Sequence, residues 1–255
     1  MALMLVLLEL AAGTTVAAFA VDLIARVGRG YIGTTAAICA AVMGVEVVIA
    51  ANVPAGAQLL AGPLAAGALS SLVHWSIGLM AALVAYTAFC AVGTDPARRV
   101  VGLATIAVAA VALAQAVVAF GPALGGSLAT VAAFAPAALL AGSTLAGMLL
   151  GHWYLVVPSL SFRPLRRSID IVFIAVAAQA VVLGIVLAVA SPMEREAMLR
   201  SHYGVVFWLL VVLTRYFARI RANQPATAML YVLIISAVMG VVPAHLLFFV
   251  SGIPV

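Results

Sequence analysis

The chain of 255 residues contains no lysine, and charged residues make up only 7% of it, against 67% hydrophobic residues. A soluble domain has roughly a quarter of its residues charged. The scarcity of charge therefore excludes an ordinary soluble enzyme and favours one domain, residues 1–255, embedded in a lipid bilayer. The net charge of +5 comes from arginines near the ends of apolar runs, so it does not indicate nucleic-acid binding.

The sequence also lacks the short motifs of common catalytic and cofactor sites. It has no CxxCH haem attachment, no P-loop, no HExxH and no GxSxG, which argues against covalent haem, nucleotide and hydrolytic chemistry. Its only two cysteines, Cys39 and Cys90, lie inside apolar runs without metal-type spacing. We interpret them as small buried apolar residues.

Long apolar runs, separated by glycine, proline and arginine, dominate what is present. Runs of about 20 apolar residues predict transmembrane helices. We expect eight, at residues 2–25, 31–53, 64–93, 98–120, 127–157, 168–190, 201–221 and 226–250. The first run lacks a basic start and contains Glu9 and Asp22, so we expect a retained helix and not a signal peptide. The predicted fold class is an all-α integral membrane protein.

The arginines predict the orientation of these helices. With eight spans, ten of the twelve arginines fall on one side of the membrane, and only Arg195 and Arg200 fall on the other. Basic loops face the cytoplasm. We therefore expect a multi-pass protein of the inner (plasma) membrane, with both termini on the outer, non-cytoplasmic side.

Weak internal similarity suggests two halves, residues 1–125 and 126–255. The segment 13–18 (GTTVAA) aligns with 142–147 (GSTLAG) at an offset of 129. At an offset of 128, His74 aligns with His202 and Phe89 with Phe217. Four helices in each half keep the same orientation. The pattern therefore predicts a parallel 4+4 pseudo-repeat about an axis along the membrane normal.

Four histidines lie in or beside the apolar runs: His74, His152, His202 and His245. Ionisable groups at that depth are costly, and they commonly serve a function. A neutral imidazole can bind haem iron through one nitrogen while a carbonyl or hydroxyl holds the other. His74, His202 and His245 are the candidate ligands of a b-type haem near the outer face. Each can instead be a hydrogen-bonding strut between helices.

His152 follows a stripe of small residues. Gly147 and Gly151 lie one helical turn apart, and Trp153 and Tyr154 come directly after His152. Such a stripe admits either another helix at close range or a flat ring, such as a quinone head or a porphyrin edge. The two aromatic residues also suit the interfacial belt. Helix packing and cofactor contact both remain open for this segment.

Three carboxylates are candidates for proton or ion binding: Glu9 and Glu46 in the outer half of the membrane, and Asp22 near the inner side. Glu9 and Glu46 can be neighbours because their helices are consecutive. For Asp22 and Asp170, pairing with nearby arginines (Arg26, Arg29, Arg166 or Arg167) is a simpler interpretation. With His74, the two glutamates would form a cluster suited to a divalent metal.

These features favour a membrane subunit that handles quinone, b-type haem or both, and exchanges electrons with other membrane or outer-side redox subunits. The general architecture resembles that of the quinone-interacting membrane anchors of respiratory complexes. The chain would then be a non-catalytic or quinone-reactive subunit of an oxidoreductase. The alternatives are a transporter of protons, a divalent metal or a small solute, and a structural or assembly subunit.

Overall fold

The computed structural model describes residues 1–54, 56–157, 159–189 and 203–252. Its long helices are α1 (Ala2–Ala25), α2 (Arg29–Ala51), α3 (Ala68–Val92), α4 (Asp95–Phe120), α5 (Ser127–Val156), α6 (Arg163–Val189), α8 (Tyr203–Arg219) and α9 (Asn223–Ser251). Two short strands, β1 (Gln58–Leu59) and β2 (Gly62–Pro63), form an antiparallel hairpin between α2 and α3. A 3-10 turn, η1 (Gly121–Ala123), follows α4.

The protein is an all-α membrane protein, as the sequence predicts. Seven of the described helices are long and apolar enough to cross a membrane. The described part of α8 has 17 residues, and residues 190–202, which precede it, lie outside the described part of the chain. The count of eight spans and the outer location of the termini therefore stay predictions.

Local chemistry shifts two helix boundaries away from those expected. The helix predicted at 98–120 begins at Asp95, because Thr94 caps it by accepting a hydrogen bond from the backbone N–H of Ala97. Pro96 in the first turn suits a helix start, where its missing N–H is not needed. The helix predicted at 64–93 begins at Ala68, directly after Gly67, whose left-handed backbone (φ 69°) cannot continue a helix.

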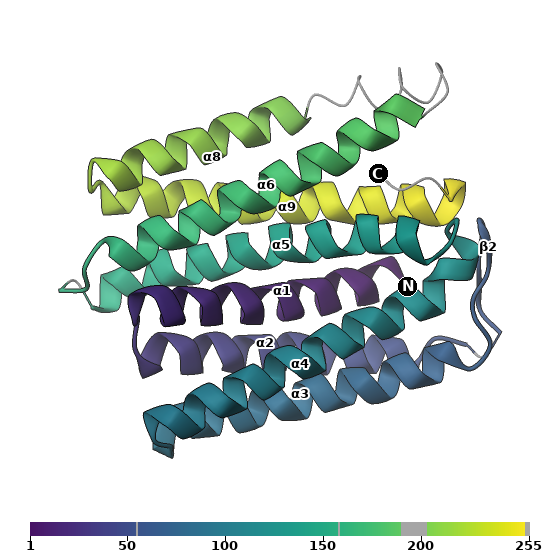
Figure 1. Cartoon of the computed structure of the whole chain (residues 1–255), viewed down its shortest axis with the longest axis horizontal. Coiled ribbons are helices and arrows are strands. Elements are labelled where there is room, and N and C mark those ends of the chain that lie inside the picture. Colours follow the sequence, from purple (N-terminus) through teal and green to yellow (C-terminus); the bar gives the residue numbers. More distant parts are fainter. Residues whose placement is uncertain (55, 158, 190–202, 253–255) are drawn as a thin grey trace.

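The described long helices form two groups that lie side by side (Figure 1). One group contains α1, α2, α3 and α4, and the other contains α5, α6, α8 and α9. The turns α1–α2, α3–α4, α5–α6 and α8–α9 lie at one end, which we call the arginine-rich end (Figure 1). The start of α1, the hairpin and the end of α9 lie at the other, the hairpin end.

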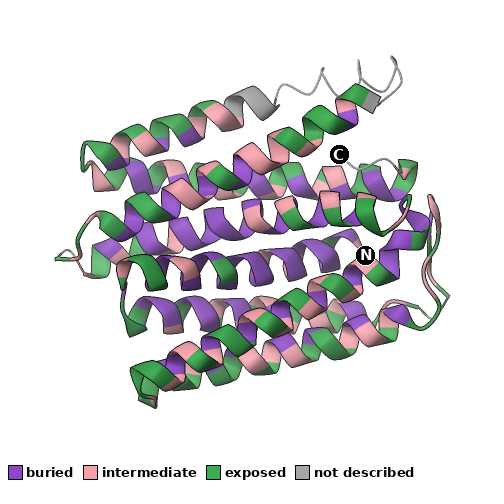
Figure 2. Ribbon diagram, in the orientation of Figure 1, coloured by how far each residue is buried: buried purple, intermediate pink, exposed green. Residues whose placement is uncertain are grey.

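The two groups meet along α1 and α5, which are the most buried helices (Figure 2). Within their most apolar stretches, 78% of α1 and 61% of α5 is buried, against 22–39% in the other five candidate spans. The closest approach is at Gly13 and Gly142. A Cβ added to Gly13 would lie 1.8 Å from the carbonyl oxygen of Ala138, and one added to Gly142 would lie 2.1 Å from the carbonyl carbon of Gly13. Only glycine permits this backbone contact.

A second contact joins the two groups at the hairpin end. The rings of Phe120, at the end of α4, and Phe249, near the end of α9, are stacked with centroids 5.2 Å apart and planes 9° apart. Both rings are buried. Like Gly13 and Gly142, these two residues are 129 positions apart in the chain.

Candidate functional site

A carboxylate–imidazole pair lies buried between the two groups of helices. Glu9 on α1 and His245 on α9 meet with Oε2 and Nε2 2.8 Å apart. Their side chains are 0% and 2% exposed. A charge buried at that depth has to be paired or neutralised. The short hydrogen bond therefore holds one shared proton between the two groups, or joins them as an ion pair.

The surroundings of this pair are apolar. The ring of Phe134 on α5 is 5.4 Å from that of His245, and Phe249 is 6.3 Å from it on the same helix. Glu9 Oε1 and His245 Nδ1 are buried without a hydrogen-bond partner among the described residues. Each such atom costs roughly 1–3 kcal/mol in a folded protein, so the pair retains hydrogen-bonding capacity for a ligand or a proton.

His245 also lines a cavity of about 270 Å³ between α5, α6, α8 and α9. Most of its wall is apolar, and the polar exceptions are His245, Ser236 and Gln179. The Oε1 atom of Gln179 is buried and unpaired within the described part of the chain. Trp208 contributes an aromatic face. An apolar cavity with a few polar groups is the usual form of a small-molecule site.

The rim of this cavity reaches the surface of the helix bundle. Leu183 on α6 is 36% exposed, and Gly240 on α9 is also exposed. A Cβ added at Gly240 would meet nothing within 4 Å. Both residues belong to helices that are long and apolar enough to cross a membrane.

His74 lies apart from this pair, near the hairpin end of α3. Its Nδ1 is 2.6 Å from the carbonyl oxygen of Ser70 on the same helix. Because a carbonyl only accepts, Nδ1 carries the hydrogen and Nε2 presents its lone pair. His74 also lines a separate cavity of about 520 Å³ walled by α2, α3 and the segment between them. This carbonyl contact is the kind expected behind a metal-binding imidazole, although haem ligation stays a prediction.

His152 and its neighbouring glycines serve helix contacts in the structure. His152 Nδ1 lies 3.1 Å from the hydroxyl of Tyr231 on α9, and both side chains are exposed. A Cβ added at Gly151 would lie 2.7 Å from Thr227 Oγ1, and one at Gly147 would lie 3.0 Å from Leu230. The small-residue stripe is therefore filled by α9. A flat ring would bind there only if α9 moved away.

Trp153 and Tyr154 likewise have packing roles. The indole of Trp153 lies against α2, where a Cβ added at Gly30 would be 2.6 Å from its Cζ2. The hydroxyl of Tyr154 donates to the carbonyl oxygen of Ser161 and accepts from the backbone N–H of Leu165. Tyr154 thereby ties the end of α5 to the start of α6.

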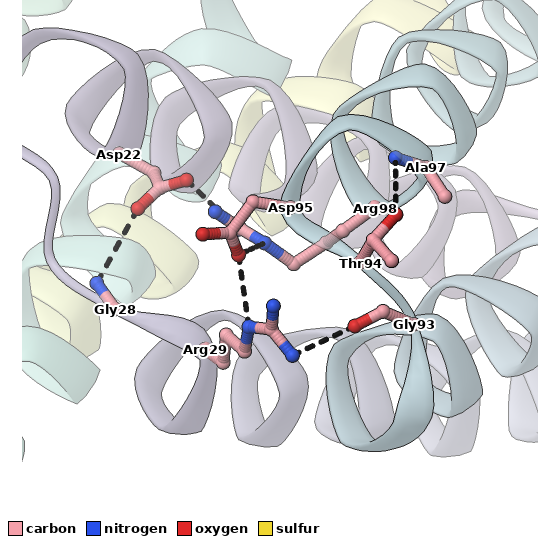
Figure 3. A network of polar contacts seen from close by, with 8 residues as sticks. All are labelled: Asp22, Gly28, Arg29, Gly93, Thr94, Asp95, Ala97 and Arg98. Atoms are coloured by element: carbon pink, nitrogen blue, oxygen red, sulfur yellow. Dashed lines mark hydrogen bonds and ion pairs between the residues drawn. The ribbon is translucent and has the colours of Figure 1, made fainter.

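Asp22 takes part in a network of charges at the arginine-rich end (Figure 3). The expectation that it pairs with Arg26 or Arg29 is wrong: its Oδ2 is 2.8 Å from Nη1 of Arg98 on α4, and both side chains are at most 5% exposed. Arg29 pairs instead with Asp95 at 2.8 Å and donates to the carbonyl oxygen of Gly93. The sequence missed Arg98 because it was expected at the very start of a helix.

The other acidic candidates have separate partners. Glu46 Oε1 accepts a hydrogen bond from Ser76 at 3.2 Å, and both residues are completely buried between α2 and α3. Asp170 pairs with Arg215 at 3.0 Å and with Arg167 at 3.5 Å. Glu9, Glu46 and His74 thus bond to three different residues, and the structure does not bring them together in a group that could hold a metal ion.

His202 lies outside the described residues. Within the part of the chain that the structure describes, no three His, Cys, Asp or Glu side chains come together in a way that could hold a metal ion.

Sequence reasoning missed the cavity itself. Gln179, Ser236 and Trp208 stand on three different helices, so no sequence spacing connects them. The one available signal was an amide side chain in the apolar run 168–190. Comparison with protein-family models, with curated proteins and with solved structures finds no match, so the chemistry of the site alone guides its interpretation.

Proposed function

We propose that the protein is a membrane subunit that binds the head group of a lipid-soluble quinone in the cavity beside His245, and that Glu9 and His245 exchange its protons. The observation that carries this proposal is a buried carboxylate–imidazole pair at the wall of an apolar cavity whose rim includes exposed residues of candidate membrane-spanning helices. The volume of about 270 Å³ is near the lower end of ligand sites, at roughly 300–1,000 Å³. It suits a ring, with the tail remaining in the bilayer.

The polar groups of the wall match what a quinone head requires. A quinone has two carbonyl oxygens, and a quinol has two hydroxyls. The amide of Gln179 can donate to the former or accept from the latter, and Nδ1 of His245 can do the same according to its protonation. Trp208 can stack on the ring.

The imidazole of His245 can act as a proton relay. When a quinol gives up two protons and two electrons, the protons leave in turn: each passes to Nδ1 while the proton on Nε2 moves to Glu9 across the 2.8 Å contact, and Glu9 releases the first proton before it takes the second. The electrons pass to the redox centre of a partner protein. In the direction of quinone reduction, every transfer is reversed. Imidazole suits this relay because its two nitrogens exchange protons near neutral pH.

We further propose that the two groups of helices are repeats related by a two-fold axis along the membrane normal. Two-fold symmetry brings equivalent residues together at the axis. Gly13 with Gly142 and Phe120 with Phe249 are such pairs, each 129 positions apart. At the same offset, the α1–α4 contact between Asp22 and Arg98 corresponds to the α5–α9 contact between Gly151 and Thr227.

The proposed repeat helps to explain why the polar groups of this cavity belong to the second half. At the offset of 129, His245 corresponds to Ala116 and Gly240 to Val111. The first half thus places a methyl group where the second half has an imidazole, and a branched side chain where the second half leaves space. Glu9, from the first half, crosses to the second half to complete the site.

Quinone binding can be tested by fluorescence quenching of Trp208. The purified protein in mild detergent is titrated with a short-tailed quinone, and the signal of Trp75 and Trp153 is subtracted with a Trp208→Phe variant. Gly240→Leu should fill the cavity and weaken binding by about tenfold or more, since a whole leucine side chain competes with the ring. Gly184→Leu is the matched control, because a Cβ there also meets nothing within 4 Å and Gly184 lies outside the cavity wall.

The outcomes separate this function from its alternatives. Saturable quenching that Gly240→Leu weakens and Gly184→Leu preserves would support the quinone site. Equal quenching in both variants, or no saturable quenching in the unmodified protein, would refute it. Retention of a quinone through purification, measured in an organic extract, would provide independent support.

A further inference from the structure

Positive charge is concentrated where α6 begins and α8 ends, at the arginine-rich end (Figure 1). The first turns of α6 carry four charged residues at positions i, i+3, i+4 and i+7, which place them on one face of the helix: Arg163, Arg166, Arg167 and Asp170. Arg215 and Arg219 lie one turn apart on α8. We call these six residues the α6–α8 arginine cluster. Five arginines against one aspartate leave it with four excess positive charges.

One carboxylate joins the two helices in this cluster. Asp170 Oδ1 lies 3.0 Å from Nη2 of Arg215, and Asp170 Oδ2 lies 3.5 Å from Nη1 of Arg167. The guanidinium of Arg215 also lies over the ring of Phe173 on α6, 5.2 Å from its centroid. Arg167 and Arg215 are therefore held beside the same carboxylate, although they belong to different helices.

Arg166 and Arg219 extend the cluster toward the end of the molecule. Because α6 begins there and α8 ends there, the two helices run in opposite directions (Figure 1). Each of these arginines stands four residues, or about 6 Å, beyond the contact between Asp170 and Arg215. They therefore lie at about the same level on neighbouring helices. Both are exposed, and neither pairs with an acidic group in the described part of the chain.

This arrangement of guanidinium groups favours an anionic ligand. Each guanidinium presents five N–H donors in a planar fork that matches the oxygens of a phosphate. The contacts with Asp170 use a single nitrogen of Arg167 and a single nitrogen of Arg215. The preference of basic residues for the cytoplasmic side requires only their number on that side. It does not explain why they gather on two helices around one carboxylate.

An exposed apolar surface continues directly from the cluster along α6. Ile174, Val181 and Ile185 follow Asp170 by 4, 11 and 15 positions, so they lie on the same helix face as the charged residues. Each of these three side chains is at least 60% exposed, and α6 is long and apolar enough to cross a membrane. Phosphate-binding groups at one end of a face and apolar side chains along the rest of it match the two parts of a phospholipid.

We propose that the α6–α8 arginine cluster binds the head group of an anionic phospholipid with two phosphates, and that the acyl chains of this lipid lie along the exposed apolar face of α6. Basic pockets between membrane helices bind such head groups. A phosphodiester has a single negative charge, so four excess positive charges favour a lipid with two phosphates over a lipid with one. The proposal does not depend on quinone binding, because the quinone cavity is lined by other residues of α6: Val176, Gln179, Ala180 and Leu183.

Lipid binding can be tested by native mass spectrometry of the full-length protein, released from detergent micelles at a fixed salt concentration. The protein is titrated with diphosphatidylglycerol and, separately, with zwitterionic phosphatidylcholine of the same acyl chains. Diphosphatidylglycerol should bind about tenfold more tightly or better, and Arg166→Gln/Arg219→Gln should weaken its binding by about tenfold or more, because two charges that attract the phosphates are lost. This double variant should fold normally, since both side chains are exposed and lie outside the ion pairs with Asp170.

The matched control is Arg26→Gln/Arg99→Gln, which removes the same amount of charge from the same end of the protein. Both arginines belong to the first half, and neither forms an ion pair with a described residue. This variant should bind diphosphatidylglycerol as the unmodified protein does. An equal loss of affinity in the two double variants would refute the site, because general surface charge would then account for the binding. Equal binding of the two lipids by the unmodified protein would refute it as well.

Pyrophosphate separates a lipid from a soluble phosphate compound, because it carries two phosphates without acyl chains. It is titrated against the unmodified protein under the same conditions. Weaker binding of pyrophosphate than of diphosphatidylglycerol would support the contact between the acyl chains and the apolar face of α6. Binding of pyrophosphate that is as tight as that of the lipid would overturn the assignment to a phospholipid.

Discussion

The contact between α1 and α5 at Gly13 and Gly142 allows a direct test of how the two halves associate. In Gly142→Ala, the new methyl carbon would lie 2.1 Å from the carbonyl carbon of Gly13, whereas ordinary contacts begin at 3.4 Å. The obstructing atoms belong to the backbone, so no side chain can rotate away. The two helices have to separate by more than an ångström along the most buried contact of the protein.

The expected cost follows from this geometry. Overpacking a close contact costs about 1–3 kcal/mol and sometimes more, and a rigid backbone neighbour places this site at the upper end. Alanine recovers up to about 1 kcal/mol as a better helix former than glycine. We therefore expect Gly142→Ala to lower the free energy of unfolding by about 2 kcal/mol. Gly184→Ala, where the methyl group meets nothing within 4 Å, should be neutral or slightly stabilising.

Reversible unfolding in mixed micelles, followed by tryptophan fluorescence, measures both variants against the unmodified protein. The comparison is matched because each variant replaces one glycine by alanine inside a long helix. If the two variants differ by less than about 0.5 kcal/mol, the scatter of ordinary surface substitutions, the close backbone contact is wrong. The proposed axis between the halves would then lose its central support.

Three further predictions concern the charged and cofactor-binding groups. Asp22→Gly leaves the buried Arg98 with only the more distant Asp95 at 3.8 Å, and Arg98→Thr leaves the buried Asp22 without an ion-pair partner among the described residues. Each change alone should destabilise the protein by about 3–5 kcal/mol, whereas the double variant, which copies Gly151 and Thr227, should cost less than either. Unfolding in mixed micelles measures all three variants, and simple additivity would contradict the pairing. Glu9→Gln should keep a hydrogen bond to His245 but remove the carboxylate that accepts the proton. Quinone should therefore still quench Trp208 fluorescence, while quinol-dependent proton release falls by about tenfold or more. Unchanged proton release would exclude Glu9 from the relay. If a b-type haem is bound, a dithionite-reduced minus air-oxidised spectrum should show a sharp α-band that His74→Ala removes, and a flat spectrum would exclude haem.

The sequence by itself determined that the fold is built from apolar helices. Two thirds of the residues are hydrophobic and the charged residues are few, so the backbone has to satisfy its own hydrogen bonds in helices. Glycine, proline and arginine mark where those helices end. The segment around Gly13 also resembles the segment around Gly142 in sequence. Close contacts between helices require small residues, so such segments stay similar even where the surrounding residues differ.

Only the tertiary structure decided which polar groups meet. Glu9 and His245 are 236 positions apart. Asp22 forms its ion pair with Arg98 on another helix and not with the nearby Arg26 or Arg29. Helical spacing fixes the face on which a side chain lies, but not the helix that covers that face. That choice depends on how closely the helices approach, which here is controlled by Gly13, Gly142, Gly102 and Gly151. Where a glycine allows a neighbouring helix or ring to approach closely, the polar side chains beside it come into contact. The periodicity of a single helix does not predict that contact.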